Sequence, residues 1–187
     1  MKKVLSIVVR NQPGVLMRVA GMFSRRGFNI DSLAVGMTHN RKFSRMTVTL
    51  DDDEATINQI IKQLEKLIEI EDVRLLTPEI QLSRGMALIK VAAGEHRMEV
   101  LKLAEVFRAS VIDVGETVVI FEITGVERKL KAFIEVMRPY GILEMVQTGV
   151  VAIERGENCL SLGEHEKYAW PEDNEDNNDN MGNCMII

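Results

Sequence analysis

The pattern of apolar and polar positions changes its period several times along the chain. The first segment, Val4–Arg10, is apolar and rich in β-branched residues, which predicts a buried strand. After a break at residues 11–14, apolar side chains recur every three or four positions, which predicts a helix that ends at Gly27. The apolar positions of this helix are Val15, Val19, Met22 and Phe23.

Four further elements follow in the first half of the chain. Residues 28–37 and 43–50 predict two strands joined by a polar loop. Asp51, Asp52 and Asp53 then place negative charge where the start of a helix favours it. The apolar stripe of this second helix is Ile57, Ile60, Ile61, Leu64 and Leu67. With a last strand at 73–76, the predicted order is βαββαβ.

The same order of elements is predicted again after a linker at residues 78–84. Strands are expected at 86–92, 111–114, 118–123 and 142–153. The two helices between them carry apolar stripes at Val100, Leu103, Ala104 and Phe107, and at Leu130, Phe133, Ile134 and Met137. The chain is therefore expected to be an α+β protein with two tandem ferredoxin-like domains, residues 1–78 and 79–156. In each domain both helices cover one face of an antiparallel sheet, and the other face is free to pair.

Charge and composition change this picture mainly at the C-terminal end. Residues 156–187 hold 8 acidic and 1 basic side chains, whereas the whole chain of 187 residues has a net charge of −5. Residues 157–187 are therefore expected to form an acidic, disordered tail. No apolar run approaches the roughly 20 residues that span a bilayer, and the first residues do not resemble a signal peptide. A cytoplasmic protein without nucleic-acid or membrane partners is expected.

Catalytic and metal-binding motifs are absent from the sequence. The three histidines stand in unrelated polar contexts, and no nucleophile–base pair, phosphate loop or paired metal ligands can be found. Cys159, His165 and Cys184 could be combined into a metal site, but no close pair of cysteines supports one. We therefore expect no catalytic residue, no metal and no cofactor in this chain.

The turn between the first strand and the first helix is the best candidate for a binding site. A helix N-terminus presents unpaired N–H donors to a small carboxylate, and Gly14 allows a ligand to approach the backbone. Asn11 and Asn29 can offer acceptors to an ammonium group, and Val15 and Ile30, with Val35, could form an apolar wall. A zwitterionic aliphatic amino acid would suit this pocket. From the residues alone, a cap, a tight turn and the end of a strand explain the pattern equally well.

Several blocks of sequence resemble the small, regulatory subunits of acetolactate (acetohydroxyacid) synthase. The resemblance covers about residues 2–156, in order and at compatible spacing. The blocks that carry it are Asn11–Leu16, Phe23–Leu33, Phe43–Thr47, Met86–Val91, Ile112–Val114 and Thr148–Ala152. The blocks in the first half are specific to the family.

The resemblance implies an ACT domain that binds a branched-chain amino acid, usually valine, at the interface of a homodimer, followed by a second ferredoxin-like domain. It places the effector between Asn11, Gly14 and Val15 of one chain and Asn29 and Ile30 of the other. It also implies a catalytic large subunit, which this chain activates and makes sensitive to feedback inhibition in branched-chain amino-acid biosynthesis. Thiamine diphosphate, Mg²⁺ and FAD are expected in that partner.

Two other functions remain possible from the sequence. The ACT module could belong to a stand-alone amino-acid sensor or transcriptional regulator, although no helix-turn-helix or basic stripe is present. An acylphosphatase-like hydrolase is the third alternative, but the glycine-rich phosphate loop that it needs is missing. The family pattern is also broken at Phe107–Ala109, where Ala109 replaces a usual glycine, and the loop at Gly94–Glu95 is short.

Overall fold

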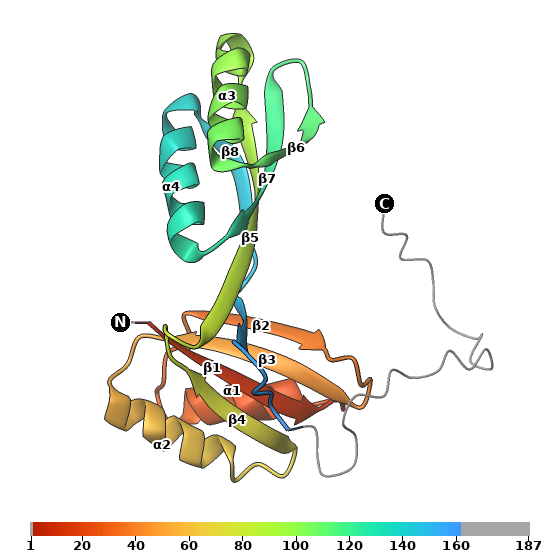
Figure 1. The fold of residues 1–187 in the computed structure, drawn as a ribbon, viewed down its shortest axis with the longest axis vertical. Helices are drawn as coiled ribbons and strands as arrows, with labels where there is room; N and C mark the ends of the chain where they lie inside the picture. Colours follow the sequence, from red (N-terminus) through yellow and green to blue (C-terminus); the bar gives the residue numbers. More distant parts are fainter. Residues whose placement is uncertain (1, 162–187) are drawn as a thin grey trace, which may run out of the picture.

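A computed structural model describes residues 2–161 of the chain as two antiparallel sheets joined end to end (Figure 1). The first unit has strand order β2-β3-β1-β4, and the second has β6-β7-β5-β8, with β9 paired to β5. The elements of the first unit are β1 (Lys3–Arg10), α1 (Val15–Arg25), β2 (Ser32–Met37), β3 (Phe43–Leu50), α2 (Glu54–Leu64) and β4 (Ile70–Leu76). This order confirms the predicted ferredoxin-like unit.

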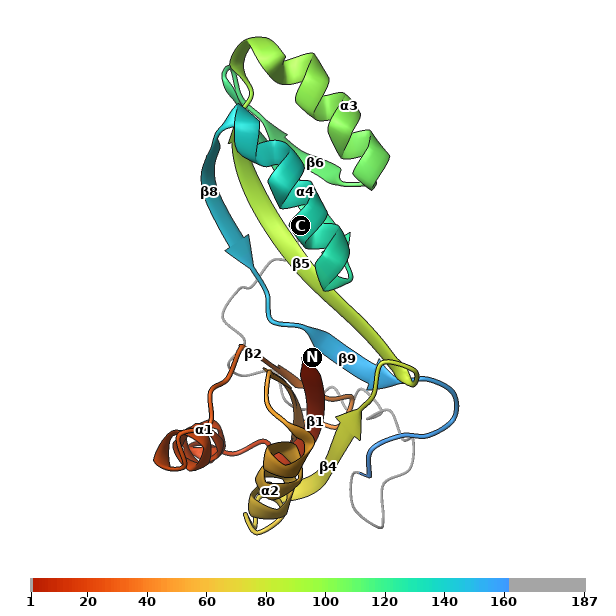
Figure 2. The same ribbon diagram turned by 90° about the vertical axis from the view of Figure 1, so that its left-hand side faces the viewer.

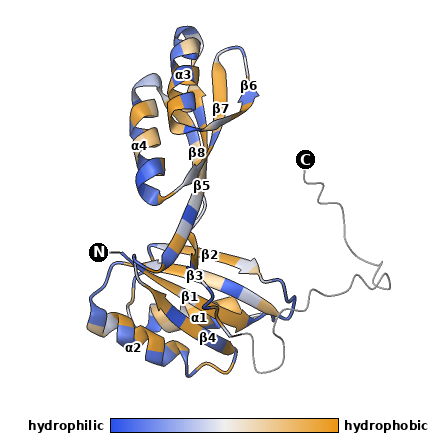
Figure 3. Ribbon diagram, viewed as in Figure 1, coloured by the Kyte–Doolittle hydropathy of each residue, from blue (hydrophilic) through white to orange (hydrophobic). Residues whose placement is uncertain are grey.

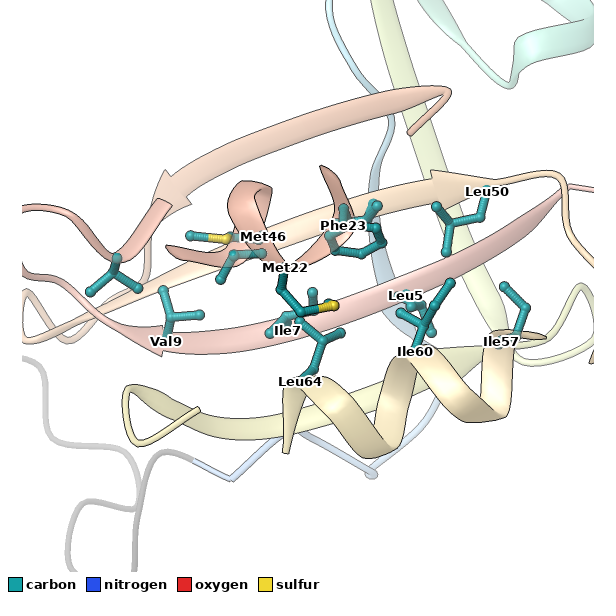
Figure 4. Packing of buried hydrophobic residues seen from close by; sticks show 13 residues of the cluster. Leu5, Ile7, Val9, Met22, Phe23, Met46, Leu50, Ile57, Ile60 and Leu64 are labelled. Carbon is teal, nitrogen blue, oxygen red and sulfur yellow. The ribbon is translucent and has the colours of Figure 1, made fainter. Parts of the chain in front are cut away.

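The helices of the first unit bury the apolar positions that the sequence predicts. Gly14 precedes α1 in the left-handed conformation, with φ at 85°. Asp53 caps α2 by accepting a hydrogen bond of 2.7 Å from the amide of Thr56. The helices pack on alternate residues of the strands, and Figure 4 shows the resulting core around Phe23 and Leu64. Only one face of the sheet is used in this way.

The second unit repeats the arrangement with its own core. Phe121 and Phe133, both fully buried, lie at its centre with ring centroids 5.8 Å apart. Figure 3 shows that hydrophobic residues dominate the strands, whereas the helices also carry hydrophilic residues. The elements are β5 (Gln81–Ala92), the 3-10 turn η1 (Gly94–His96), α3 (Arg97–Phe107), β6 (Ser110–Val114), β7 (Val118–Gly125), α4 (Glu127–Met137), η2 (Arg138–Tyr140), β8 (Ile142–Gln147) and β9 (Val151–Glu154).

Strand β5 is longer than predicted and belongs to both parts of the molecule (Figure 2). Residues 85–92 pair with β7 in the second unit, whereas residues 81–84 pair with β9. The predicted linker at 78–84 is therefore wrong for its second half, which forms a two-stranded arm with β9. Hereafter "the arm" means Gln81–Arg84 together with β9.

The predicted strand at 142–153 is interrupted between β8 and β9. Ala87 pairs with Gln147 in β8, but Arg84 pairs with Val151 in β9, so the second strand contains one extra residue. Thr148 fills the gap by bonding through its amide and its hydroxyl to Met86. The irregularity is a β-bulge, which reorients the side chains that follow it.

The arm covers part of the open face of the first sheet. Ala152 of β9 is buried against Val4 of β1 and Leu76 of β4. The expectation that this face is free therefore holds only in part for the first unit.

The predicted tail begins at residue 157, but the structure also describes residues 157–161. The amide of Ser161 bonds to Asp72 at 2.8 Å. The remaining predicted tail, 162–187, lies outside the described residues.

Smaller differences concern the ends of elements. Strand β2 starts at Ser32 rather than at residue 28, although Phe28 and Ile30 pack against the core as strand residues would. Helix α2 ends at Leu64, and Leu67 packs on the core from the following turn. Burial explains the apolar pattern at these positions without requiring regular hydrogen bonding.

Candidate functional site

The predicted turn after β1 is held by hydrogen bonds to the loop before β3. The amide of Asn11 donates to the carbonyl of Lys42 at 2.6 Å, and its side-chain Nδ2 donates to the carbonyl of Arg41 at 2.9 Å. The side chain of Asn11 is therefore oriented by its NH₂ group, and its amide oxygen can still accept a hydrogen bond. This is the group that a ligand ammonium requires.

The start of α1 has the features of an anion site. No side chain caps this helix, and its first turn contains no acidic residue. The first backbone N–H groups of a helix lack intrahelical partners and carry its positive dipole end. Gly14 has open space where a Cβ would stand. The amide of Val15 bonds to the carbonyl of Gln12 at 3.4 Å, and a small carboxylate could reach the amides that follow by approaching over Gly14.

The two halves of the predicted site lie at opposite ends of the sheet within one chain. Val15 is buried at the turn, beside the end of β1 that pairs with Phe43. Asn29, which is exposed, and Ile30, which is half-buried, precede β2 at the end of the sheet near Thr49. Thr49 lies six positions after Phe43 along β3, which is about 20 Å at the usual rise of a strand. One chain therefore does not bring Asn29 and Ile30 to the turn.

Strand β2 is an edge of the first sheet, paired on one side with β3. Val35 and Met37 on this strand are 45% and 70% exposed, and Leu16 and Met17 of α1 are also exposed. An edge with apolar side chains is a surface on which another strand can pair.

The contacts between the arm and the first sheet were not predicted from the sequence. Arg45 of β3 donates through Nη2 to the carbonyl of Ala152 at 2.9 Å, and Arg74 of β4 pairs with Glu154 at 2.7 Å. Burial and the neighbouring charge of Arg74 lower the pKa of Arg45. The hydrogen bond with Arg74 lowers the pKa of Glu154. Strand alternation places both arginines on the open face, but it does not reveal the strand that covers them.

A second group of ion pairs joins the start of β2 to the second unit. Lys2 Nζ lies 3.6 Å from Asp31 and 3.0 Å from Glu127 at the start of α4, and Glu127 also pairs with Lys131 at 2.7 Å. The pKa of Lys2 is raised by its bond with Glu127. The pKa of Glu127 is lowered by its bonds with Lys131 and Lys2. The units are thus linked by charge as well as by the arm.

Between β2, β3 and the arm there is an open groove of about 540 Å³. Its walls are mainly apolar, and Arg45 lies in it with a buried Nε that has no hydrogen-bond partner in the described part of the chain.

No group of three metal-ligating side chains occurs among residues 2–161. Of the three residues that could be combined into a metal site, Cys159 is exposed, and His165 and Cys184 lie outside the described residues.

The comparisons with known proteins agree with both units. Residues 5–72 match the AHAS small subunit-like ACT domain, and residues 84–156 match the family described as the small subunit of acetolactate synthase. A probable acetolactate synthase small subunit from Archaeoglobus fulgidus is 48% identical over 157 residues, which cover 83% of this chain and 98% of that protein. The chain belongs to the acetolactate synthase small-subunit family. The resemblance noted in the sequence is thereby confirmed.

Other members of the acetolactate synthase small-subunit family show the same extent of similarity. The small subunit from Mycolicibacterium smegmatis is 44% identical over 153 residues, with 81% of this chain and 90% of that protein covered. The crystal structure of the small subunit from Thermotoga maritima superposes with a TM-score of 0.80 at 40% identity, covering 84% of this chain and 99% of that one. Within residues 2–161, no helix has the length and apolar character needed to cross a membrane.

Proposed function

We propose that this chain is the regulatory subunit of an acetolactate synthase in the cytoplasm, activating a catalytic large subunit and making it sensitive to a branched-chain amino acid, with valine as the first candidate. The uncapped start of α1 carries this proposal, because it provides N–H donors beside the oriented amide of Asn11. The thiamine-dependent chemistry belongs to the catalytic subunit, and this chain supplies no reacting group.

A homodimer completes the proposed site. If the β2 edges of two chains pair antiparallel about a two-fold axis, the start of β2 in one chain lies beside the end of β2 in the other. Asn29 and Ile30 of the partner subunit then approach Asn11, Gly14 and Val15. The 20 Å separation within one chain supports this arrangement, since these residues can meet only across two chains.

The chemistry of the combined site suits a zwitterionic aliphatic amino acid. The carboxylate accepts hydrogen bonds from the start of α1, and the ammonium group donates to the amide oxygens of Asn11 and the partner's Asn29. The aliphatic side chain contacts Ile30 and Val35, which are half-buried and exposed respectively in one chain. The side chain of valine has one methylene fewer than that of leucine or isoleucine, a difference worth about 1–3 kcal/mol in an apolar pocket.

Isothermal titration of the full chain with valine, leucine and isoleucine tests the site. We expect Gly14→Asp and Asn29→Ala to weaken binding about tenfold or more, because each removes or blocks a hydrogen bond to a charged ligand group. Gly156→Asp is the matched control for the first variant, since Gly156 also has a positive φ of 78° and open space around it. Asn58→Ala, on the exposed side of α2, controls for the second. Wild-type affinity in both site variants would disprove this site.

Reconstitution with a catalytic large subunit tests the regulatory role. We expect the chain to co-purify with that subunit, to raise its acetolactate synthase activity, and to make the activity fall when valine is added. Linked binding at two sites typically involves 1–3 kcal/mol of coupling. Valine binding without association with the catalytic subunit would favour a stand-alone ACT sensor instead.

A further inference from the structure

The bulge between β8 and β9 lies directly against the backbone of β2. A Cβ atom at Gly149 would lie 2.8 Å from the carbonyl oxygen of Leu33, 2.9 Å from its carbonyl carbon and 3.1 Å from the amide of Ala34. These are backbone atoms, which cannot rotate away as a flexible side chain could. Only glycine at position 149 therefore allows this approach.

A hydrogen-bonded hydroxyl accompanies the backbone contact. The amide of Val150 donates to Ser32 Oγ at 3.4 Å, and Thr49 Oγ1 donates to the same oxygen at 2.7 Å. One hydroxyl group, that of Ser32, therefore joins three segments: β2, β3 and the bulge of the second unit. Because one side of the contact belongs to β2 and the other follows β8, a shift of either unit must change it.

The ion pairs of Lys2 form a second contact beside the first. Lys2 lies between Asp31, directly before β2, and Glu127, at the start of α4. We call these two contacts together the latch: Lys2, Asp31–Leu33, Glu127 and Gly149–Val150. The latch therefore reaches both the bulge and a helix of the second unit.

The latch follows the proposed effector residues without a gap in the sequence. Asn29 and Ile30 are exposed or half-buried, and the next three residues, Asp31–Leu33, form one side of the latch. The amide of Asp31 also bonds to the carbonyl of Thr49 at 2.9 Å, so that this segment is fastened to β3. A ligand that displaces Asn29 or Ile30 therefore acts on residues that already touch the second unit.

We propose that the latch transmits effector binding in the first unit to the second unit, an inference that rests on the proposed function. Binding at Asn29 and Ile30 shifts the start of β2, and the contact of Leu33 with Gly149 changes the position of β8 and β9. The catalytic subunit then distinguishes two arrangements of the units. By linkage, whatever fixes the second unit also changes the affinity of the complex for the effector.

The test uses the full chain with two latch variants, each with a matched control. Gly149→Ala inserts a methyl group into the contact, and its control is Gly85→Ala, where the nearest atom outside the chain neighbours lies 3.5 Å away on a side chain. Lys2→Gln removes the charge that joins the units. Its control is Lys131→Gln, because Lys131 also pairs with Glu127 but does so from within α4. Ser32→Ala removes one hydroxyl and replaces Gly149→Ala if that variant does not fold.

Four readouts separate transmission from binding. We expect the latch variants to bind valine within about threefold of wild type by titration and to stimulate the catalytic subunit as wild type does. Half-maximal inhibition should need at least about fivefold more valine, the lower limit of typical coupling. Hydrogen exchange should show that valine changes the protection of residues 142–154 in wild type and controls, but not in the latch variants.

Two results would overturn the coupling. Inhibition of the latch variants at the wild-type valine concentration would show that the signal bypasses the latch. An unchanged effect of valine on residues 142–154 in these variants would show the same without the catalytic subunit. Absence of valine binding by the wild-type chain would instead contradict the proposed function, and the coupling with it.

Discussion

A hydrogen bond between one side chain and a backbone amide fixes where helix α2 begins. Asp53 is exposed, yet its carboxylate accepts the Thr56 amide at 2.7 Å, and this hydrogen bond lowers its pKa. The run Asp51–Asp53 predicts the start of α2, but it does not single out Asp53 as the cap. The cap depends on which aspartate has an extended backbone beside the first turn, and that is Asp53.

Replacing the cap should destabilise the first unit. Asp53→Ala removes the acceptor of the Thr56 amide and should lower the free energy of unfolding by about 1 kcal/mol. Urea denaturation followed by circular dichroism would measure this change. The neighbouring Asp52→Ala should leave the stability within about 0.5 kcal/mol of wild type. Equal losses in the two variants would mean that the charge of the run, rather than the cap, matters.

Single residues also show which parts of a site can be predicted from sequence. Asn11 and Gly14 are recognisable because their turn is local, with a helix beginning one residue after Gly14. Gly149 is different, because the reason for a glycine there is a backbone more than a hundred residues away. No local pattern contains that information. The orientation of Asn11 by the carbonyl of Arg41 likewise depends on the pairing of β1 with β3.

At the scale of elements, periodicity predicted strands and helices well wherever one face is buried. Helix α1 covers Val15–Arg25, as its four buried apolar residues predict. Prediction was wrong for the start of β5, because Gln81–Arg84 follows Pro78 and is partly polar, as a linker would be. These residues are a strand because β9 pairs with them, and β9 comes much later in the chain.

Helix α4 provides a test of the second core. Phe133 is fully buried, with Phe121 and Phe107 rings at 5.8 and 5.4 Å. Phe133→Ala should therefore lower the free energy of unfolding by about 3–5 kcal/mol. Thermal and urea unfolding would measure the loss. Arg128→Ala, an exposed position of the same helix, should change stability little. A loss below 1 kcal/mol for Phe133→Ala would contradict the described core.

The edge strand β2 provides a test of the proposed dimer. Met37→Lys introduces a charge at a 70% exposed position near the end of this edge, where antiparallel pairing would bury it beside the start of β2 of the partner subunit. We expect dissociation to monomers in analytical ultracentrifugation and weaker valine binding. Met98→Lys changes an equally exposed methionine on α3 and should leave the dimer intact. A Met37→Lys dimer with wild-type stability would exclude pairing through this edge.

On the scale of the whole molecule, acidic side chains connect the units to each other. Glu154 pairs with Arg74, and Glu127 pairs with Lys2, and the pKa of each carboxyl lies below its ordinary value of 4.5. A carboxyl whose pKa is lowered by folding stabilises the folded state above its ordinary pKa. That contribution is lost as the pH falls below about 4.5. The contact between the units should therefore be sensitive to acid.

Thermal unfolding at pH 7 and pH 4 tests this sensitivity. The melting temperature of the wild type should fall further between pH 7 and pH 4 than that of the double variant Glu127→Gln, Glu154→Gln. The double variant has no carboxyl to protonate at these positions. Glu65→Gln with Glu95→Gln, two exposed positions outside this interface, should behave as the wild type does. Identical pH dependence in all three proteins would show that these pairs do not stabilise the folded state.

The passage of β5 through both units also limits how the length of the chain can change. Successive side chains of a strand point to opposite faces, so that gain or loss of one residue within 81–92 would exchange the faces of every residue on one side of the change. Either Ala152 would lose its partners over Val4 and Leu76, or Ile89 would leave the second core. Single-residue insertions and deletions are therefore expected to be tolerated in the turn at residues 77–80 rather than within β5. The strand therefore sets a fixed distance between the first unit and the second unit.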